Sequence, residues 1–216
     1  PNFHKLQELL PKLGQIRMVQ ANFSQYSSRY DKYLEGTVLP AFDPQLSGGA
    51  LYDINIYNLN LIIGLFGAPN NLIYQARKGF NGIDTSGVVL MSYPEFQALA
   101  IGAKDSDSPS TCLIQGEKGW LKVETAPNQL EKIACQIRGE DNIQEYALNQ
   151  YPHRLSHEFA AFAAMLANKD FAGRDLYLNI SLQVAEAAEK SRKQADISFL
   201  ADQYLRSVPG GAKCPE

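Results

Sequence analysis

The sequence predicts an α+β fold, an open and mainly antiparallel β-sheet with helices packed on one face. Between residues 70 and 141, β-favouring segments follow one another with only short turns between them, and such short connections join antiparallel neighbours. Helical patterns flank this region, and strands do not alternate with helices as they do in a parallel sheet. The expected strands are residues 72–77, 85–92, 96–103, 110–115, 120–124 and 130–137.

The N-terminal third predicts two helices and one further strand. Residues 3–13 place leucines at helical spacing, and Gly14 follows as a stop signal. Residues 16–28 are rich in β-favouring side chains and predict a strand, whereas residues 29–47 predict a loop. Residues 50–66 are apolar all round the helical wheel, so this helix is expected to be buried on most sides.

The C-terminal part predicts three helices. One begins at a Ser156 cap and runs to about residue 168, a second covers about 177–195, and a short last one covers 197–206. Glu158 lies in the first turn of the first of these helices, where a carboxylate is favourable. The apolar face expected to be buried on that helix consists of Phe159, Phe162, Met165 and Leu166.

Composition excludes several classes of protein. The chain has 216 residues, of which 45% are hydrophobic and 20% charged, and its net charge is −3, which gives no support to nucleic-acid binding. Its longest apolar run, residues 59–68, is too short to span a bilayer, so no membrane partner is expected. The three cysteines have neither metal nor redox spacing, which favours a reduced, cytoplasmic protein without a metal site.

Several catalytic motifs are absent from the sequence. There is no G-x-G-x-x-G dinucleotide fingerprint, no P-loop and no H-E-x-x-H pair. No serine or cysteine lies in a nucleophile-elbow pattern. The chain alone is therefore expected to lack a self-sufficient catalytic apparatus.

A polar stripe interrupts the apolar helix predicted for residues 50–66. Asp53, Tyr57 and Asn60 lie at positions i, i+4 and i+7, which project along one narrow side of a helix. Asn55 and Asn58 point roughly to the opposite side. Polar groups on a buried helix are costly unless they are satisfied.

Two interpretations of this stripe stay open on the residues alone. In the first, the three groups hydrogen-bond a neighbouring loop and serve the structure. In the second, they form the wall of a site in which the tyrosine moves a proton and the carboxylate orients the substrate. Gly48 and Gly49 would let a ligand approach the backbone closely at the entrance of the helix.

The same segment resembles a family signature. Residues 48–57 read G-G-A-L-x-D-x-x-x-Y and residues 65–69 read L-F-G-x-P, which resembles the opening of the C-terminal domain of the Gfo/Idh/MocA oxidoreductases. The similarity extends over nearly the whole chain. Further similar pieces are residues 26–31, 82–86, 114–119 and 181–184.

The resemblance implies a two-domain enzyme of which this chain is the second domain. In that family an N-terminal Rossmann domain binds NAD or NADP and supplies a lysine from a Glu-Lys-Pro motif, which this chain lacks. The C-terminal domain resembles those of dihydrodipicolinate reductase and glyceraldehyde-phosphate dehydrogenase. It shapes the substrate pocket and forms a homo-oligomer through its open sheet face. The implied function is the substrate-binding and oligomerisation domain of an NAD(P)-dependent oxidoreductase acting on a sugar, polyol or related CH–OH substrate.

The resemblance also assigns roles to residues. Asp53 takes the place of the signature carboxylate, and Tyr57 takes the His/Tyr position, a proposed proton relay, so these two are the expected catalytic residues. The expected substrate contacts are Asn60, Arg29, Tyr30 and Gly49. No cofactor-binding residue is expected in this chain, because the cofactor is bound mainly by the missing domain.

Two departures from the signature leave an alternative function open. Asn60 stands where many relatives have Asp, and Asn55 replaces a usual Gly. The alternative is a non-catalytic module of the same fold that binds a small ligand or another protein. Under the oxidoreductase interpretation, the isolated fragment is expected to be inactive.

The expected domain organisation has three parts. Residues 1–14 form a linker helix from the missing Rossmann domain, and its leucines are expected to be partly exposed without that domain. Residues 15–207 form the α+β domain, and residues 208–216 form a mobile tail. Pro1 in place of a starting Met fits a piece of a longer protein.

Overall fold

The computed structural model describes residues 1–203 of the chain. The last helix expected at 197–206 lies partly outside the described residues, and residues 201–203 are helical. The tail expected at 208–216 lies wholly outside them.

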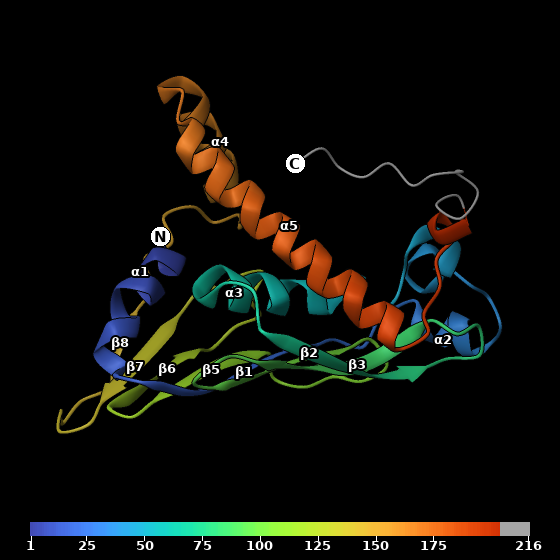
Figure 1. The fold of residues 1–216 in the computed structure, drawn as a ribbon, viewed down its shortest axis with the longest axis horizontal. Helices are drawn as coiled ribbons and strands as arrows, with labels where there is room; N and C mark the ends of the chain where they lie inside the picture. The colour runs from blue at the N-terminus through green and yellow to red at the C-terminus, as the bar shows by residue number, and fades with distance from the viewer. Residues whose placement is uncertain (204–216) are drawn as a thin grey trace.

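One mixed sheet of eight strands forms the floor of the domain (Figure 1). Its order is β2-β3-β4-β1-β5-β6-β7-β8, and every neighbouring pair is antiparallel except β1 and β4. The open, mainly antiparallel α+β fold is therefore confirmed. The strands are β1 (Ile16–Ser24), β2 (Asn71–Lys78), β3 (Asp84–Ser92), β4 (Gln97–Ala103), β5 (Thr111–Gly116), β6 (Gly119–Val123), β7 (Ile133–Ile137) and β8 (Gln144–Tyr146).

Three features of the sheet differ from the prediction. The first strand ends at Ser24 and not at residue 28, and the three-residue strand β8 was not expected. The parallel pairing of β1 with β4 was not expected either, since the two strands are separated by a long segment containing β2 and β3. Local pattern identifies a strand, but the choice of a distant partner depends on tertiary packing.

Three helical segments cover one face of this sheet (Figure 1). They are α1 (Asn2–Leu9), α3 (Ile56–Phe66) with the π-helical turn η4 (Leu51–Asn55) before it, and α5 (Phe171–Gln194). Seven strands each contribute one side chain to a row of cross-strand partners that points toward these helices, and each of these side chains is at most 3% exposed. This row consists of Leu72, Met91, Ala98, Val19, Ile114, Leu121 and Cys135.

The first helix packs into this core, contrary to the exposure expected for its leucines. Leu6, Leu9 and Leu13 are all 0% exposed, and Leu13 lies in the 3₁₀ turn η1 (Leu10–Leu13). The helix contacts β7, and the Asn2 side chain donates to the carbonyls of Leu130 and Glu131 at 2.7 and 2.8 Å. Its apolar face is therefore satisfied by the sheet of the same domain.

The helices α4 and α5 form a hairpin that extends beyond the sheet (Figure 1). α4 (Leu155–Asn168) has no buried residue, and the exposed fractions of Phe159, Phe162 and Leu166 are 69%, 50% and 81%. The prediction that these side chains form a buried face is wrong, because within residues 1–203 only α5 lies beside that face and an open cleft separates the two helices. Ser156 is also not the cap, since the helix begins at Leu155.

The segment expected as a loop at residues 29–47 contains short helices. α2 (Tyr30–Leu34) is followed by 3₁₀ turns at Pro40–Phe42 and Pro44–Leu46. Tyr33 is 1% exposed and stacks between the rings of Phe42 and Phe80, with centroids 4.8 and 4.5 Å away. This aromatic cluster fixes the segment against the domain beside the site described next.

No helix within residues 1–203 is long and apolar enough to cross a lipid bilayer. Among the same residues there is no group of three histidine, cysteine or acidic side chains placed to hold a metal ion.

Candidate active site

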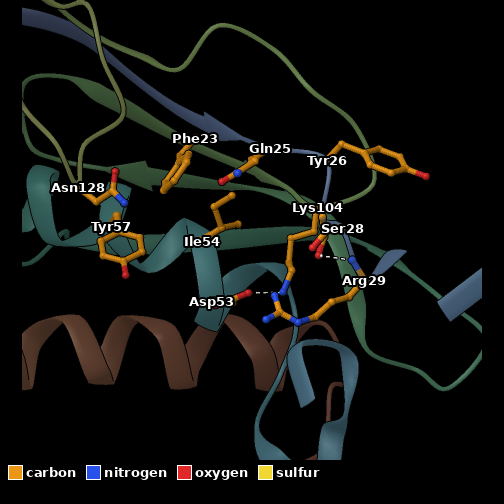
Figure 2. Close-up of a pocket in the computed structure, with 11 residues that line it drawn as sticks. Phe23, Gln25, Tyr26, Ser28, Arg29, Asp53, Ile54, Tyr57, Lys104 and Asn128 are labelled. Atoms are coloured by element: carbon orange, nitrogen blue, oxygen red, sulfur yellow. Dashed lines mark hydrogen bonds and ion pairs between the residues drawn. The ribbon is translucent and has the colours of Figure 1, made fainter. Parts of the chain in front are cut away.

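A polar cavity of about 300 Å³ lies where β1 and β4 end side by side (Figure 2). Because the two strands are parallel, their carboxyl ends meet at the same edge of the sheet. The Gln25 N–H donates to the Ala103 carbonyl and the Ser27 N–H to the Lys104 carbonyl, each at 2.9 Å. The lining residues are Phe23, Gln25, Tyr26, Ser27, Ser28, Arg29, Asp53, Ile54, Tyr57, Lys104 and Asn128.

Asp53 enters the cavity from a π-helical turn, a feature that is frequent at functional sites. The turn begins after Gly49, whose φ of +105° a side chain would not tolerate, and a Cβ there would lie 2.1 Å from Asp84 Oδ1. Asp84 Oδ2 accepts the Leu51 N–H at 2.6 Å and the Tyr74 hydroxyl at 2.7 Å. A 1%-exposed carboxylate thus holds the start of the helix that carries the site. Burial raises the pKa of Asp84, and its hydrogen bonds oppose this rise.

Two asparagines anchor the other side of this helix to the sheet. Asn55 donates to the Ala100 carbonyl at 3.0 Å, and Asn58 donates to the Ile101 carbonyl at 2.8 Å. Both are 0% exposed, as expected for residues opposite the stripe. A Cβ at Gly102 would lie 2.6 Å from the Asn55 Cβ, so glycine permits this close approach of helix and strand. Asp53 and Tyr57 therefore face the cavity.

Lys104 follows β4 directly and forms an ion pair with Asp53. Its Nζ also donates to the Ala41 carbonyl at 2.9 Å and lies 4.6 Å from the centre of the Phe42 ring. Burial lowers the pKa of Lys104, and the hydrogen bond and charge of Asp53 oppose that effect. The lysine side chain is 4% exposed and that of Asp53 is 54% exposed.

Tyr57 and Asn128 lie at the other end of the cavity (Figure 2). The Tyr57 ring packs against that of Phe23, with the ring centroids 5.8 Å apart. Asn128 comes from the segment between β6 and β7, and its buried Oδ1 has no hydrogen-bond partner among residues 1–203. The cavity therefore combines a carboxylate, a phenol, amides and an ammonium, a set suited to a small ligand with several hydroxyl groups.

The structure brings only part of the expected site together. Asp53, Tyr57 and Arg29 line the cavity, and Asp53 and Arg29 also border an adjoining hollow of about 500 Å³. Asn60 does not line it, because its side chain donates to the Ile56 carbonyl at 2.8 Å and is exposed on the helix. Tyr30 packs in the aromatic cluster against Phe42, with centroids 5.7 Å apart.

Gly49 has a role different from the expected ligand contact. It is absent from the residues lining either hollow, and its backbone conformation instead lets Asp84 approach the start of the turn. Its neighbour Gly48 lines the adjoining hollow.

Sequence reasoning missed Lys104, Gln25 and Asn128. A lysine directly after an apolar strand was the available signal for Lys104, but its proximity to Asp53 depends on β4 lying beside the helix that carries Asp53. Asn128 lies in an irregular segment without any pattern. Their roles follow from tertiary structure alone.

The fold and cavity define an open-sheet α+β domain with a polar ligand site, and comparison with known proteins assigns its family. The sequence profile of the GFO/IDH/MocA C-terminal domain matches residues 3–122. The chain therefore belongs to this family of C-terminal domains.

Two curated relatives resemble the chain over almost all of its length. It is 34% identical over 203 residues to scyllo-inositol 2-dehydrogenase (NADP(+)) IolU of Bacillus subtilis, covering 94% of the chain and 61% of that protein. It is 35% identical over 204 residues to the uncharacterized oxidoreductase YgjR of Escherichia coli, covering 94% of the chain and 60% of that protein. The chain thus spans about three fifths of the length of these relatives.

Solved structures share the fold. An inositol dehydrogenase homolog from Azotobacter vinelandii, complexed with NAD+, superposes with a TM-score of 0.67 at 16% identity and covers 90% of this chain and 60% of that one. KijD10, a 3-ketoreductase from Actinomadura kijaniata in complex with NADP and TDP-benzene, superposes with a TM-score of 0.68 at 18% identity, covering 88% and 58%.

Proposed function

We propose that this chain is the substrate-binding domain of an NAD(P)-dependent oxidoreductase that acts on a CH–OH group of a polyol, sugar or related small molecule. The observation that carries the proposal is the joint presence of Asp53 and Tyr57 in a polar cavity of about 300 Å³, in a chain of this family. The named activities of IolU and of the Azotobacter inositol dehydrogenase homolog support the class of substrate.

The cofactor would be held mainly by a domain outside this chain. Residues 1–203 contain no glycine-rich phosphate loop at a helix N-terminus, so they do not by themselves cradle a dinucleotide. When bound, the nicotinamide supplies the acceptor for the hydride that leaves the carbinol carbon. This chain supplies the groups that bind the alcohol and handle its proton.

Within the cavity, each side chain has a defined task in this proposal. Tyr57 Oη accepts the hydrogen bond of the reacting hydroxyl and takes up its proton while the phenolic proton leaves to water or to a base of the cofactor-binding domain. The Asp53 carboxylate accepts a hydrogen bond from a neighbouring hydroxyl and orients the ring of the substrate. Asn128 Oδ1, which has no partner within the described residues, accepts from a further hydroxyl after a small shift.

The two departures from the family signature do not alter the cavity. Asn55 bonds the sheet and Asn60 bonds its own helix, so neither belongs to the lining residues. The argument for a non-catalytic module rested on these two positions, and the structure gives it no further support.

We assign the docking of the cofactor-binding domain to the α4–α5 hairpin. A cleft of about 600 Å³ between these helices is lined mostly by apolar side chains, including Phe162, Leu166 and Leu178, which are 50–81% exposed. About two fifths of each relative's own length lies outside the matched region, which is enough for such a domain. In this proposal residues 1–14 connect the two domains while packing on the second.

The open face of the sheet is the proposed homo-oligomer contact. Ile73, Leu90 and Leu99 are cross-strand neighbours there, and Ile73 and Leu90 are 46% and 36% exposed. An antiparallel sheet can leave one face in water, so the exposed apolar side chains on this face are what indicate a partner surface. A cytoplasmic location remains part of the proposal, supported by the free, buried thiols of Cys112 and Cys135.

The decisive experiment uses the full-length protein with scyllo-inositol or myo-inositol and with NAD+ or NADP+. We expect cofactor reduction by the full-length protein and none by the 216-residue chain. Tyr57→Phe should lower kcat by about 10²-fold or more, because it removes the proton-transferring hydroxyl. Tyr151→Phe, an exposed tyrosine far from the cavity residues in sequence, is the control. Wild-type turnover by Tyr57→Phe would refute the assigned role.

A further inference from the structure

We propose that Lys104 is a positioning residue of this site, which holds the Asp53 carboxylate at the cavity wall in the orientation that binds substrate. The inference rests on the proposed function, since it concerns how the same site is organised. Lys104 is not part of the signature segment at residues 48–69, and it reaches the site only because β4 lies beside β1.

The ammonium of Lys104 is fixed from several sides. Its Nζ donates to the Ala41 carbonyl at 2.9 Å and lies 4.6 Å from the Phe42 ring centre, while its own backbone N–H donates to the Thr85 carbonyl at 2.8 Å. Ala41 and Phe42 belong to a 3₁₀ turn that the aromatic cluster holds in place. The ammonium therefore has a defined position before any ligand arrives.

The two partners of the ion pair differ in exposure. The Lys104 side chain is 4% exposed, whereas that of Asp53 is 54% exposed and faces the cavity (Figure 2). The buried ammonium has a fixed position, whereas the exposed carboxylate can adopt several orientations. The ion pair therefore selects the orientation of Asp53 that contacts Lys104. The direct contact leaves the other carboxylate oxygen for a ligand hydroxyl.

Stability alone does not explain this arrangement. Burying an ammonium is costly, and replacing a buried ion pair by apolar side chains is often neutral or stabilising. A methionine at position 104 would fill similar space without that cost, and Asp53 would remain half exposed and hydrated. The contribution of Lys104 is therefore to fix the orientation of Asp53, and not to stabilise the fold.

The charges around Lys104 agree with this role. Asp53 on η4 and Asp84 on β3 favour its charged form, whereas burial and Arg29, in the segment after β1, oppose it. Figure 2 shows the Arg29 side chain extending toward Lys104 and Asp53. Because Asp53 contributes both a hydrogen bond and charge, its removal should lower the pKa of Lys104 further.

The first test is a double-mutant cycle in the full-length protein. We expect Lys104→Met to lower kcat/KM for the inositol substrate about tenfold to 100-fold while the unfolding temperature is kept. Asp53→Asn combined with Lys104→Met should be no worse than Asp53→Asn alone, because Lys104 acts through Asp53. Lys193→Met, whose ion pair with Glu189 on α5 is exposed, is the matched control. Wild-type kcat/KM in Lys104→Met, or losses that multiply in the double variant, would overturn the proposal.

The second test needs no activity and uses the 216-residue chain. The ¹³Cε resonance of Lys104 is titrated in the wild type and in Asp53→Asn. Because Asp53→Asn retains Lys104, this measurement can be made even if Lys104→Met does not fold. We expect a lower Lys104 pKa in Asp53→Asn, and an unchanged pKa would overturn the ion pair. If the full-length protein oxidises no polyol, the proposed function fails, while this titration still decides whether Lys104 holds Asp53.

Discussion

At the scale of single residues, Asp84 is the buried carboxylate that supports the site without entering it. It accepts hydrogen bonds from the Leu51 N–H and the Tyr74 hydroxyl beneath the Gly48–Gly49 turn, and it is only 1% exposed. Burial raises its pKa above the ordinary value of 3.8. The folded state therefore binds this proton more tightly than the unfolded state does.

The sign of the resulting pH dependence follows from linkage. A raised pKa contributes stability below the unfolded-state value, and this contribution is lost as pH rises through the folded-state pKa. Asp84→Asn, which keeps an acceptor oxygen, should therefore unfold at a temperature a few degrees above wild type at about pH 7. This difference should shrink at about pH 3, where both proteins are uncharged at this position.

Thermal unfolding followed by circular dichroism across this pH range measures the effect. Asp175→Asn, an exposed position on α5, should leave the pH dependence as in the wild type. A lower unfolding temperature for Asp84→Asn at about pH 7 would mean that the charged carboxylate stabilises the turn.

At the scale of elements, the helix η4–α3 and the hairpin α4–α5 show opposite outcomes of apolar patterning. The first is buried between α5 and the sheet, and asparagines on its inner side bond to β4. In the second, α4 and the first half of α5 carry apolar side chains into solvent, whereas the second half of α5 packs on α3. An apolar face in sequence shows that a partner surface is needed, and only the fold shows whether that surface belongs to the same domain.

The hairpin proposal predicts protection in the longer protein. With Cys214 replaced by serine, Leu178→Cys should react with a thiol reagent at least tenfold more slowly in the full-length protein than in the 216-residue chain, because a docked domain covers it. Ile143→Cys, 52% exposed between β7 and β8, should react alike in both.

Equal reaction of Leu178→Cys in the two proteins would contradict this docking site. Protection that appears in the 216-residue chain as its concentration rises would identify a second copy as the occupant instead. The native Cys112 and Cys135 are buried, at 1% exposure each, and should contribute little background.

At the scale of the whole molecule, the sheet has one covered face and one open face (Figure 1). The open face carries partly exposed apolar side chains on β2 and β3, at one edge of the sheet, and we expect it to bind a second copy. Leu90→Glu should shift the full-length protein toward the monomer in sedimentation velocity, because a carboxylate buried without a partner is costly. Leu148→Glu, in the segment after β8, is the control.

A monomer at every concentration in the wild type would refute the oligomer proposal. An oligomer that persists in Leu90→Glu would place the contact elsewhere. Neither outcome would change the roles of Asp53 and Tyr57, since both lie on the helix that covers the other face of the sheet.

The sequence by itself determined most of the strands and helices and part of the site. Short alternating segments with tight turns specified the strands, and the spacing of Asp53 and Tyr57 placed two cavity residues on one side of a helix. These features depend on neighbours within one or two turns of the chain, so local pattern is sufficient to predict them.

Only the tertiary structure decided how these elements meet. The parallel pairing of β1 with β4 brought Lys104 to Asp53, and the packing of α1 on β7 buried leucines expected at the surface. The π-helical turn kept Asp53 and Tyr57 in the cavity, while Asn60, a turn further along, bonded to its own helix. Contacts between residues far apart in sequence are set by burial and hydrogen bonding of the whole fold, for which the local sequence carries no signal.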